Sequence, residues 1–166
     1  GEAAVPAVSY RDIFRDARFS KDKSPYKTNF GAFIKSGGRS TAGAGYYFHV
    51  EPGNSMTAGG IYMPPAPELL AIRRAIAKAP AQFEKILLDK KFSRRFGGLS
   101  DERLKTAPKG FPKDHPAIEH LKWKHYIVFR SYPDRDVLSP RYLDRCLEDF
   151  VLMAPLNEYL NRAVGR

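Results

Sequence analysis

One short stretch of the chain gathers most of the residue types that could bind an anion. Residues 18–29 read RFSKDKSPYKTN and hold four basic side chains, three Ser or Thr hydroxyls and one Tyr against a single acid. Cations supply charge and hydroxyls supply directed hydrogen bonds, which together can surround a phosphate or a carboxylate. The same composition is also typical of a solvated basic loop, so both interpretations stay open.

The predicted ligand site combines this segment with two strand glycines. The missing side chains at Gly59 and Gly60 indicate a bulge or the close approach of another backbone or of a ligand. If the segment is ordered, its charges need an anion or acids from elsewhere, for which Glu51 and Glu68 are candidates. The predicted ligand-binding residues are Arg18, Ser20, Lys21, Asp22, Lys23, Ser24, Tyr26, Lys27, Thr28, Gly59 and Gly60.

Other titratable residues give weaker indications of chemistry. His49 and Glu51 are two residues apart on a predicted strand, so both side chains point to the same face and could form an acid–base couple or a surface hydrogen bond. Three further histidines recur at a spacing of five, which does not bring three imidazoles to one metal ion on a helix. No metal site is therefore expected, and the catalytic residues, the cofactors and enzyme activity itself stay unknown.

The net charge of +10 is concentrated in two stretches. Residues 11–39 carry eight bases against three acids, and residues 90–113 carry eight bases against two acids. One basic face built from both stretches could bind nucleic acid through its phosphates, with Tyr26, Tyr46, Tyr47 and Trp123 for stacking. We expect a small anionic ligand instead, because the aromatic residues alternate with apolar neighbours as in core strands and no nucleic-acid motif is recognisable.

Length and composition favour one globular domain over residues 1–166. The chain is 43% apolar, which is enough for one sizeable core, and it has no apolar run of 18 residues that would predict a membrane span. A single cysteine cannot form an internal disulfide, which is typical of a cytoplasmic protein. The oligomeric state is not readable from these features.

Most of the strand patterns precede the helix patterns along the chain. Residues 29–34, 46–51, 56–63 and 126–132 are rich in aromatic and β-branched side chains, and Pro52–Gly53 predicts a hairpin turn between the second and third of these segments. Helices are predicted over residues 67–79 and 139–154, with an apolar stripe at Leu143, Cys146, Leu147, Phe150 and Ala154 and a break or kink at Pro155. The order predicts an α+β fold: an antiparallel or mixed sheet built on a central hairpin, with both helices on one face.

A resemblance to a known family rests on several strings in the chain. RDARFSKDKSPYKTNF, YYFHVEP, TAGGIYMPP, LLAIRRAI and LKTAPKGFPKDHPAIEHLKWK together resemble the uncharacterised family called domain of unknown function 2461. The resemblance implies no activity, but RFSKDKSPYKT matches the family's hallmark string. It also implies an additional helical segment before the hallmark, so this chain could lack a segment that the family has. The hallmark favours a binding site over a solvated loop, while a buried structural network remains a rival.

Overall fold

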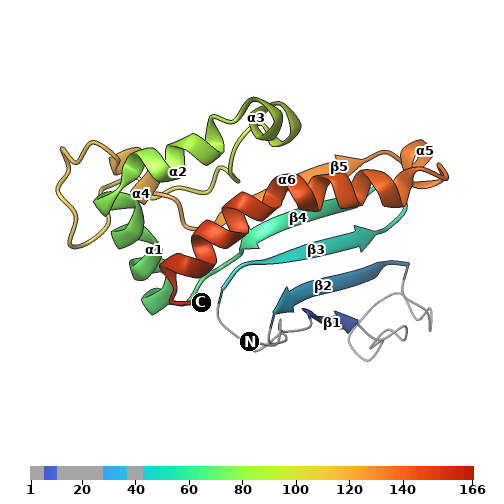
Figure 1. Cartoon of the computed structure of the whole chain (residues 1–166), viewed down its shortest axis with the longest axis horizontal. Coiled ribbons are helices and arrows are strands. Elements are labelled where there is room, and N and C mark those ends of the chain that lie inside the picture. Colours follow the sequence, from blue (N-terminus) through green and yellow to red (C-terminus); the bar gives the residue numbers. More distant parts are fainter. Residues whose placement is uncertain (1–5, 11–27, 37–42) are drawn as a thin grey trace.

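The computed structural model describes residues 6–10, 28–36 and 43–166. Five strands follow one another in a single antiparallel sheet of order β1-β2-β3-β4-β5 (Figure 1). They are β1 (Pro6–Tyr10), β2 (Phe30–Ser36), β3 (Gly45–Val50), β4 (Ser55–Ile61) and β5 (Tyr126–Tyr132). The predicted α+β class is confirmed, and so is the central hairpin, in which His49 of β3 lies opposite Met56 of β4. Pro52 and Gly53 form its turn, where Gly53 adopts a φ of 73°.

The helices fall into one long element and several short ones. They are α1 (Ala66–Lys78), α2 (Pro80–Leu87), α3 (Lys90–Phe96), α4 (Ile118–Leu121), α5 (Asp134–Val137) and α6 (Tyr142–Ala163). Local sequence explains several boundaries. The Asp89 side chain accepts hydrogen bonds from the backbone N–H groups of Lys91 and Phe92 at the start of α3, and Gly97 closes that helix in the left-handed conformation.

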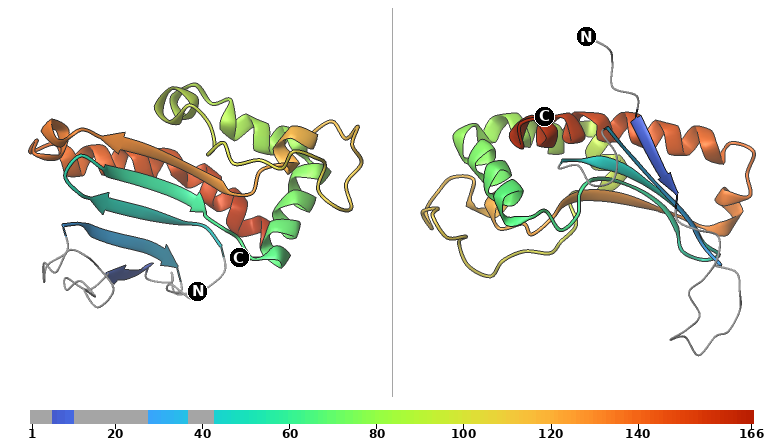
Figure 2. Two further views of the ribbon diagram at one scale, coloured as in Figure 1. Left: turned by 180° about the vertical axis from the view of Figure 1, so that it is seen from behind. Right: turned by 90° about the horizontal axis from the view of Figure 1, so that it is seen from below.

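Helix α6 covers one face of the sheet, and α1 does not share that position. Figure 2 shows α6 along the sheet, with β4 as its main partner, while α1 packs on α2, α4 and α6 beyond the ends of the strands. The expectation that both helices cover one face is therefore wrong for α1. The Pro-rich stretch of residues 64–67 starts α1 immediately after β4, so the chain turns away before it can cross the sheet.

The buried stripe of α6 also differs from the predicted one. Tyr142, Cys146, Met153, Leu156 and Leu160 are buried, whereas Leu143 is 63% and Leu147 is 52% exposed. The helix also continues through Pro155 without a break. Pro155 has no backbone N–H to donate to the carbonyl of Val151, four residues earlier. Because the proline is exposed, this carbonyl can turn toward water.

The main core lies between α6, the sheet and the helices at its end. Its fully buried members include Ile72, Ile76, Phe83, Tyr126 and Leu156, and Phe83 contacts the rings of Trp123, Tyr126 and Tyr159. Strand alternation separates two faces. The helix face carries Tyr46, Phe48, Thr57, Val128 and Tyr132, and the open face carries Gly31, Phe33, Tyr47, His49 and Ala58. Among the described residues, no helix packs on the open face.

Candidate functional site

Most of the predicted ligand segment lies outside the described residues. Arg18, Ser20, Lys21, Asp22, Lys23, Ser24, Tyr26 and Lys27 belong to that part of the chain. Thr28 is described and is exposed, immediately before Asn29 and strand β2. The binding role of the segment therefore stays a prediction. Thr28 and Asn29, the described residues at its end, show where it joins β2.

The two predicted glycines are explained by close packing within the protein. A Cβ on Gly59 would lie 2.7 Å from Met153 Sδ and 3.0 Å from Met153 Cβ, and one on Gly60 would clash with the carbonyl oxygen of Tyr126. Gly60 also has a φ of +124°, which side chains rarely adopt. The close approach is thus made by α6 and by the backbone of β5, and a ligand-binding role for the glycines stays a prediction.

Thr28 and the glycines are not brought together. Phe30, two residues after Thr28, lies opposite Val50 near the β3–β4 turn, whereas Gly60 lies opposite Gly45 at the other end of β3. A strand advances about 3.3 Å per residue, so most of the length of β3 separates the two positions.

Two side chains of β3, Tyr47 and His49, and the side chain of Glu51, which follows β3, form a hydrogen-bonded string on the open face. The Tyr47 hydroxyl lies 3.1 Å from His49 Nδ1, and His49 Nε2 lies 3.1 Å from Glu51 Oε2. Asn54 Nδ2 donates to the same Glu51 oxygen at 2.8 Å. Strand alternation predicted that His49 and Glu51 lie on one face, as an acid–base couple or as a surface hydrogen bond. The hydrogen bond is present, and the Tyr47 hydroxyl joins it.

With a neutral imidazole, the string has one consistent arrangement of protons. Hydrogen bonds from Asn54 and then from His49 lower the pKa of Glu51, so its carboxylate is the acceptor at neutral pH. His49 Nε2–H then donates to Glu51, which leaves Nδ1 of the neutral ring as an acceptor for the Tyr47 O–H. Side chains of His49 and Glu51 are 12% and 27% exposed, so the string is half-buried rather than part of the core.

The basic segment leaves and re-enters the sheet beside this string. Tyr10, the last residue of β1, lies opposite Ala32, and Phe30, the first residue of β2, lies opposite Val50. Asn29 also contributes a hydrogen bond that lowers the pKa of Glu51. The described residues on either side of 11–27 therefore lie at the end of the strands near Glu51.

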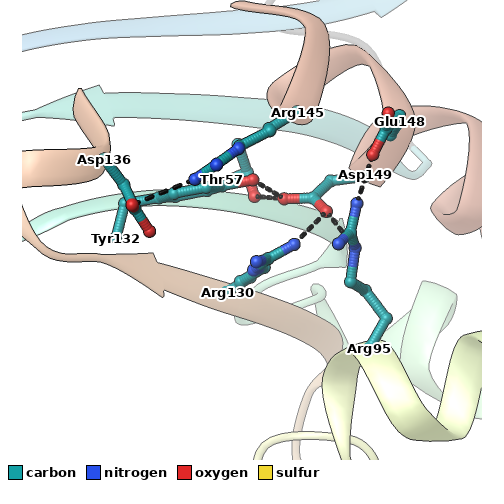
Figure 3. A network of polar contacts seen from close by, with 8 residues as sticks. All are labelled: Thr57, Arg95, Arg130, Tyr132, Asp136, Arg145, Glu148 and Asp149. Atoms are coloured by element: carbon teal, nitrogen blue, oxygen red, sulfur yellow. Dashed lines mark hydrogen bonds and ion pairs between the residues drawn. The ribbon is translucent and has the colours of Figure 1, made fainter. Parts of the chain in front are cut away.

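A second polar cluster lies on the helix face around Asp149 of α6. This carboxylate is fully buried and accepts hydrogen bonds from Thr57 Oγ1 at 2.7 Å and from the Tyr132 hydroxyl. Arg95 Nε lies 2.7 Å and Arg130 Nη1 lies 3.3 Å from its other oxygen. Figure 3 shows the four groups converging on Asp149 from β4, β5 and α3.

Charges within this Asp149 cluster are matched by partners of the protein itself. Arg95 also contacts Glu148 at 2.9 Å, and Arg145 contacts Asp136 at 3.0 Å. Burial, followed by its hydrogen bond to Asp149, raises the pKa of the Tyr132 phenol, which therefore stays protonated as a donor. Because each cation faces a carboxylate, the cluster ties α3, α6, β4 and β5 together and leaves no unmatched charge for an anion.

Asp149 was not among the residues predicted from the sequence, although its spacing indicates a buried position. Cys146, Asp149, Met153, Leu156 and Leu160 follow one another at intervals of three or four residues, which is one face of a helix. The predicted stripe lay on a neighbouring face and contained only apolar residues. An acid inside an otherwise apolar stripe indicates a buried carboxylate with partners on the opposing elements.

Residues named for nucleic-acid binding are partly engaged inside the fold. Trp123 is only 6% exposed, and Tyr46 packs on Phe150 with ring centroids 5.1 Å apart. The expectation that these two rings are free to stack is wrong, because both belong to or pack against the core. In the second basic stretch, Arg103 lies over the Trp123 ring and 3.2 Å from Asp101.

Two kinds of feature are absent from the residues that the structure describes. None of the helices there is long and apolar enough to cross a membrane. In the same part of the chain, no group of three His, Cys, Asp or Glu side chains is placed to hold a metal ion.

Comparison with known proteins gives one family and no individual relative. The family model described as "Conserved hypothetical protein (DUF2461)" matches residues 3–159, which is nearly the whole chain. No curated protein matches, and no solved structure matches.

Proposed function

The chain belongs to the DUF2461 family, and we propose that it binds a small phosphorylated or carboxylated ligand with Arg18–Thr28, beside the polar string Tyr47–His49–Glu51. One observation carries the proposal: Phe30, which follows the basic segment, lies opposite Val50, and Val50 directly precedes Glu51 of that string. The segment therefore begins its return to the sheet next to the polar side chains of the open face.

The chemistry of the two parts is complementary. Residues 18–29 supply four bases against one acid, which attracts an anion over a distance of about one Debye length, or 8–10 Å. Tyr47 and His49 supply directed polar atoms that can orient the ligand once it is held. We place the protein in the cytoplasm, as its single cysteine favours.

Thermal unfolding in the presence of anions tests this function. Inorganic phosphate, pyrophosphate and citrate are titrated at constant ionic strength against the parent chain, the double variant K23A/K27A and the matched control K90A/K91A. The control removes the same charge from exposed lysines at the start of α3. A ligand that binds only the folded state raises Tm, and one present at 100 times its Kd adds about 2.7 kcal/mol.

We expect the parent and K90A/K91A to gain Tm and K23A/K27A to gain little. Equal gains in all three proteins would contradict a site in the basic segment, because they would reflect net charge alone. If K23A/K27A is itself destabilised and no anion shifts the parent, the segment is a structural network and the proposal is wrong.

Nucleic acid is the second candidate ligand, and two features of the described residues make nucleic-acid binding less favoured. Trp123 is buried and Arg95 is paired with Asp149 and Glu148, so neither is free for a base or a phosphate. We expect a mixed-sequence oligonucleotide to bind only weakly at low salt and to dissociate as salt rises. Binding that persists at physiological salt would favour the nucleic-acid function over the small ligand.

A further inference from the structure

The string on the open face has the order of groups that a general base needs. Glu51 is the fixed acceptor, His49 is bonded through both ring nitrogens, and the Tyr47 phenol ends the string. In such an order the carboxylate holds one tautomer of the imidazole, and the imidazole in turn can take a proton from the hydroxyl. We infer that Tyr47, His49 and Glu51 form a proton relay that removes a proton from a hydroxyl-bearing ligand or water on the open face.

Several neighbours hold the acceptor end of this relay in place. Glu51 Oε2 receives Asn54 Nδ2 at 2.8 Å, and the backbone N–H of Glu51 donates to Ser55 Oγ at 3.0 Å. The backbone N–H of Asn54 donates to the Glu51 carbonyl at 2.9 Å, which closes the turn. Because the carboxylate is fixed by the hairpin turn, it orients the imidazole rather than following it.

The other end of the relay lies over a residue without a side chain. A Cβ on Gly31 of β2 would lie 2.7 Å from the Tyr47 hydroxyl oxygen and 3.3 Å from Tyr47 Cζ. Glycine at this position lets the phenol lie across the neighbouring strand, with its ring stacked at 5.9 Å from that of His49. The hydroxyl oxygen, which donates to His49, keeps lone pairs to accept a proton from a ligand.

The proposed step balances within these groups. A ligand or water O–H gives its proton to the Tyr47 oxygen while the Tyr47 proton moves to His49 Nδ1. His49 becomes an imidazolium that faces the Glu51 carboxylate, and the ligand becomes an alkoxide or hydroxide. No oxidant, metal or second substrate is needed, and reversal of the step returns the proton. The substrate class rests on the proposed function, whereas the relay itself does not.

Covalent labelling tests the relay without a known ligand. Benzenesulfonyl fluoride reacts with a phenol that is losing its proton: an O–S bond forms, the S–F bond breaks, fluoride leaves and the proton passes to the base. Tyr62, which is 63% exposed, is the internal control. We expect Tyr47 to be labelled at least about tenfold faster than Tyr62, and His49→Gln to remove that advantage, since a positioned base contributes roughly 10²-fold or more.

Peptide mass spectrometry measures both rates in each protein, and a thermal melt checks that the variant is folded. Tyr47 labelled no faster than Tyr62, or equally fast in parent and His49→Gln, would overturn the relay. Should His49→Gln fail to fold, ¹⁵N histidine spectra of the parent decide: a proton on Nε2 supports the relay, and a proton on Nδ1 overturns it. Neither measurement involves an anion, so either result is separate from the thermal-shift test.

Discussion

The Asp149 cluster and the Tyr47–His49–Glu51 string are both polar, yet they differ in burial and in the charged partners of their carboxylates. Asp149 is fully buried beneath α6 and meets two hydroxyls and two arginines. His49 and Glu51 lie half-buried on the face without a helix, and their string contains one carboxylate with no arginine or lysine bonded to it among the described residues. A charge-matched buried cluster stabilises the fold, whereas a half-buried hydrogen-bonded string that ends in a hydroxyl is suited to chemistry.

Asp149→Asn has the largest expected effect. The substitution keeps the shape of the side chain but leaves Arg95 and Arg130 without their shared carboxylate. It also places an amide at the position of the carboxylate oxygens that accept hydrogen bonds from Thr57 and Tyr132. Loss of one partner from a buried ion pair costs about 3–5 kcal/mol. Urea denaturation measures the free energy of unfolding. Glu148→Gln is the control, because this 55% exposed partner of Arg95 should contribute less than about 1 kcal/mol.

If both variants unfold at the same urea concentration, the buried carboxylate of the cluster contributes no more to stability than its exposed neighbour. If Asp149→Asn is as stable as the parent, the cluster does not tie the elements together as described.

The fold was more predictable than the polar clusters because it follows from local patterns. The alternation of YYFHVE and the Pro52–Gly53 turn were sufficient for the central hairpin. The placement of α1 was not predictable in this way, since it depends on packing against α2, α4 and α6. Helix position is decided by contacts distant in sequence, which strand and helix periodicity do not report.

The polar sites differ in how much of each was visible in the sequence. Alternation put His49 and Glu51 on one face, but it did not show that the Tyr47 hydroxyl reaches the ring. Asp149 collects partners that are 17 to 92 residues away in the sequence, so no local motif encodes the cluster. The basic segment was singled out by composition and stays a prediction for the residues outside the described ranges.

Two glycines provide the next comparison between the faces. A Cβ at Gly59 meets Sδ, Cγ and Cβ of Met153, and Cβ cannot move without the α6 backbone. The atoms nearest to a Cβ at Gly31 belong to the outer end of the Tyr47 ring, which can rotate away. We expect Gly59→Ala to destabilise by about 1–3 kcal/mol, as overpacked cores do, and Gly31→Ala by less than about 1 kcal/mol.

Gly31→Ala should instead affect the string. The displaced phenol loses His49 Nδ1, so sulfonyl labelling of Tyr47 should fall while the urea midpoint changes little. Equal destabilisation by both alanines would show that the open face is packed as tightly as the helix face. Unchanged labelling in Gly31→Ala would show that glycine is not needed for the position of Tyr47.

The smallest expected effect concerns acid unfolding and Glu51. Its pKa is lowered in the folded state, first by Asn54 and then by His49, from an ordinary value of 4.5. A carboxylate with a depressed folded pKa adds stability that is complete above the unfolded pKa and is lost as pH falls through the folded pKa. Glu51→Gln should therefore flatten the pH dependence of the unfolding free energy below about pH 4.5. Asn54→Ala should flatten it more than His49→Gln, because Asn54 is the larger cause of the lowered pKa.

Denaturant titrations from neutral pH to about pH 3 measure the slopes. They are done at low salt, since salt screens the charge of a partly exposed carboxylate. Parallel slopes in Glu51→Gln and the parent would mean that the carboxylate is not held by these donors. The string would then lack the fixed acceptor on which the relay depends.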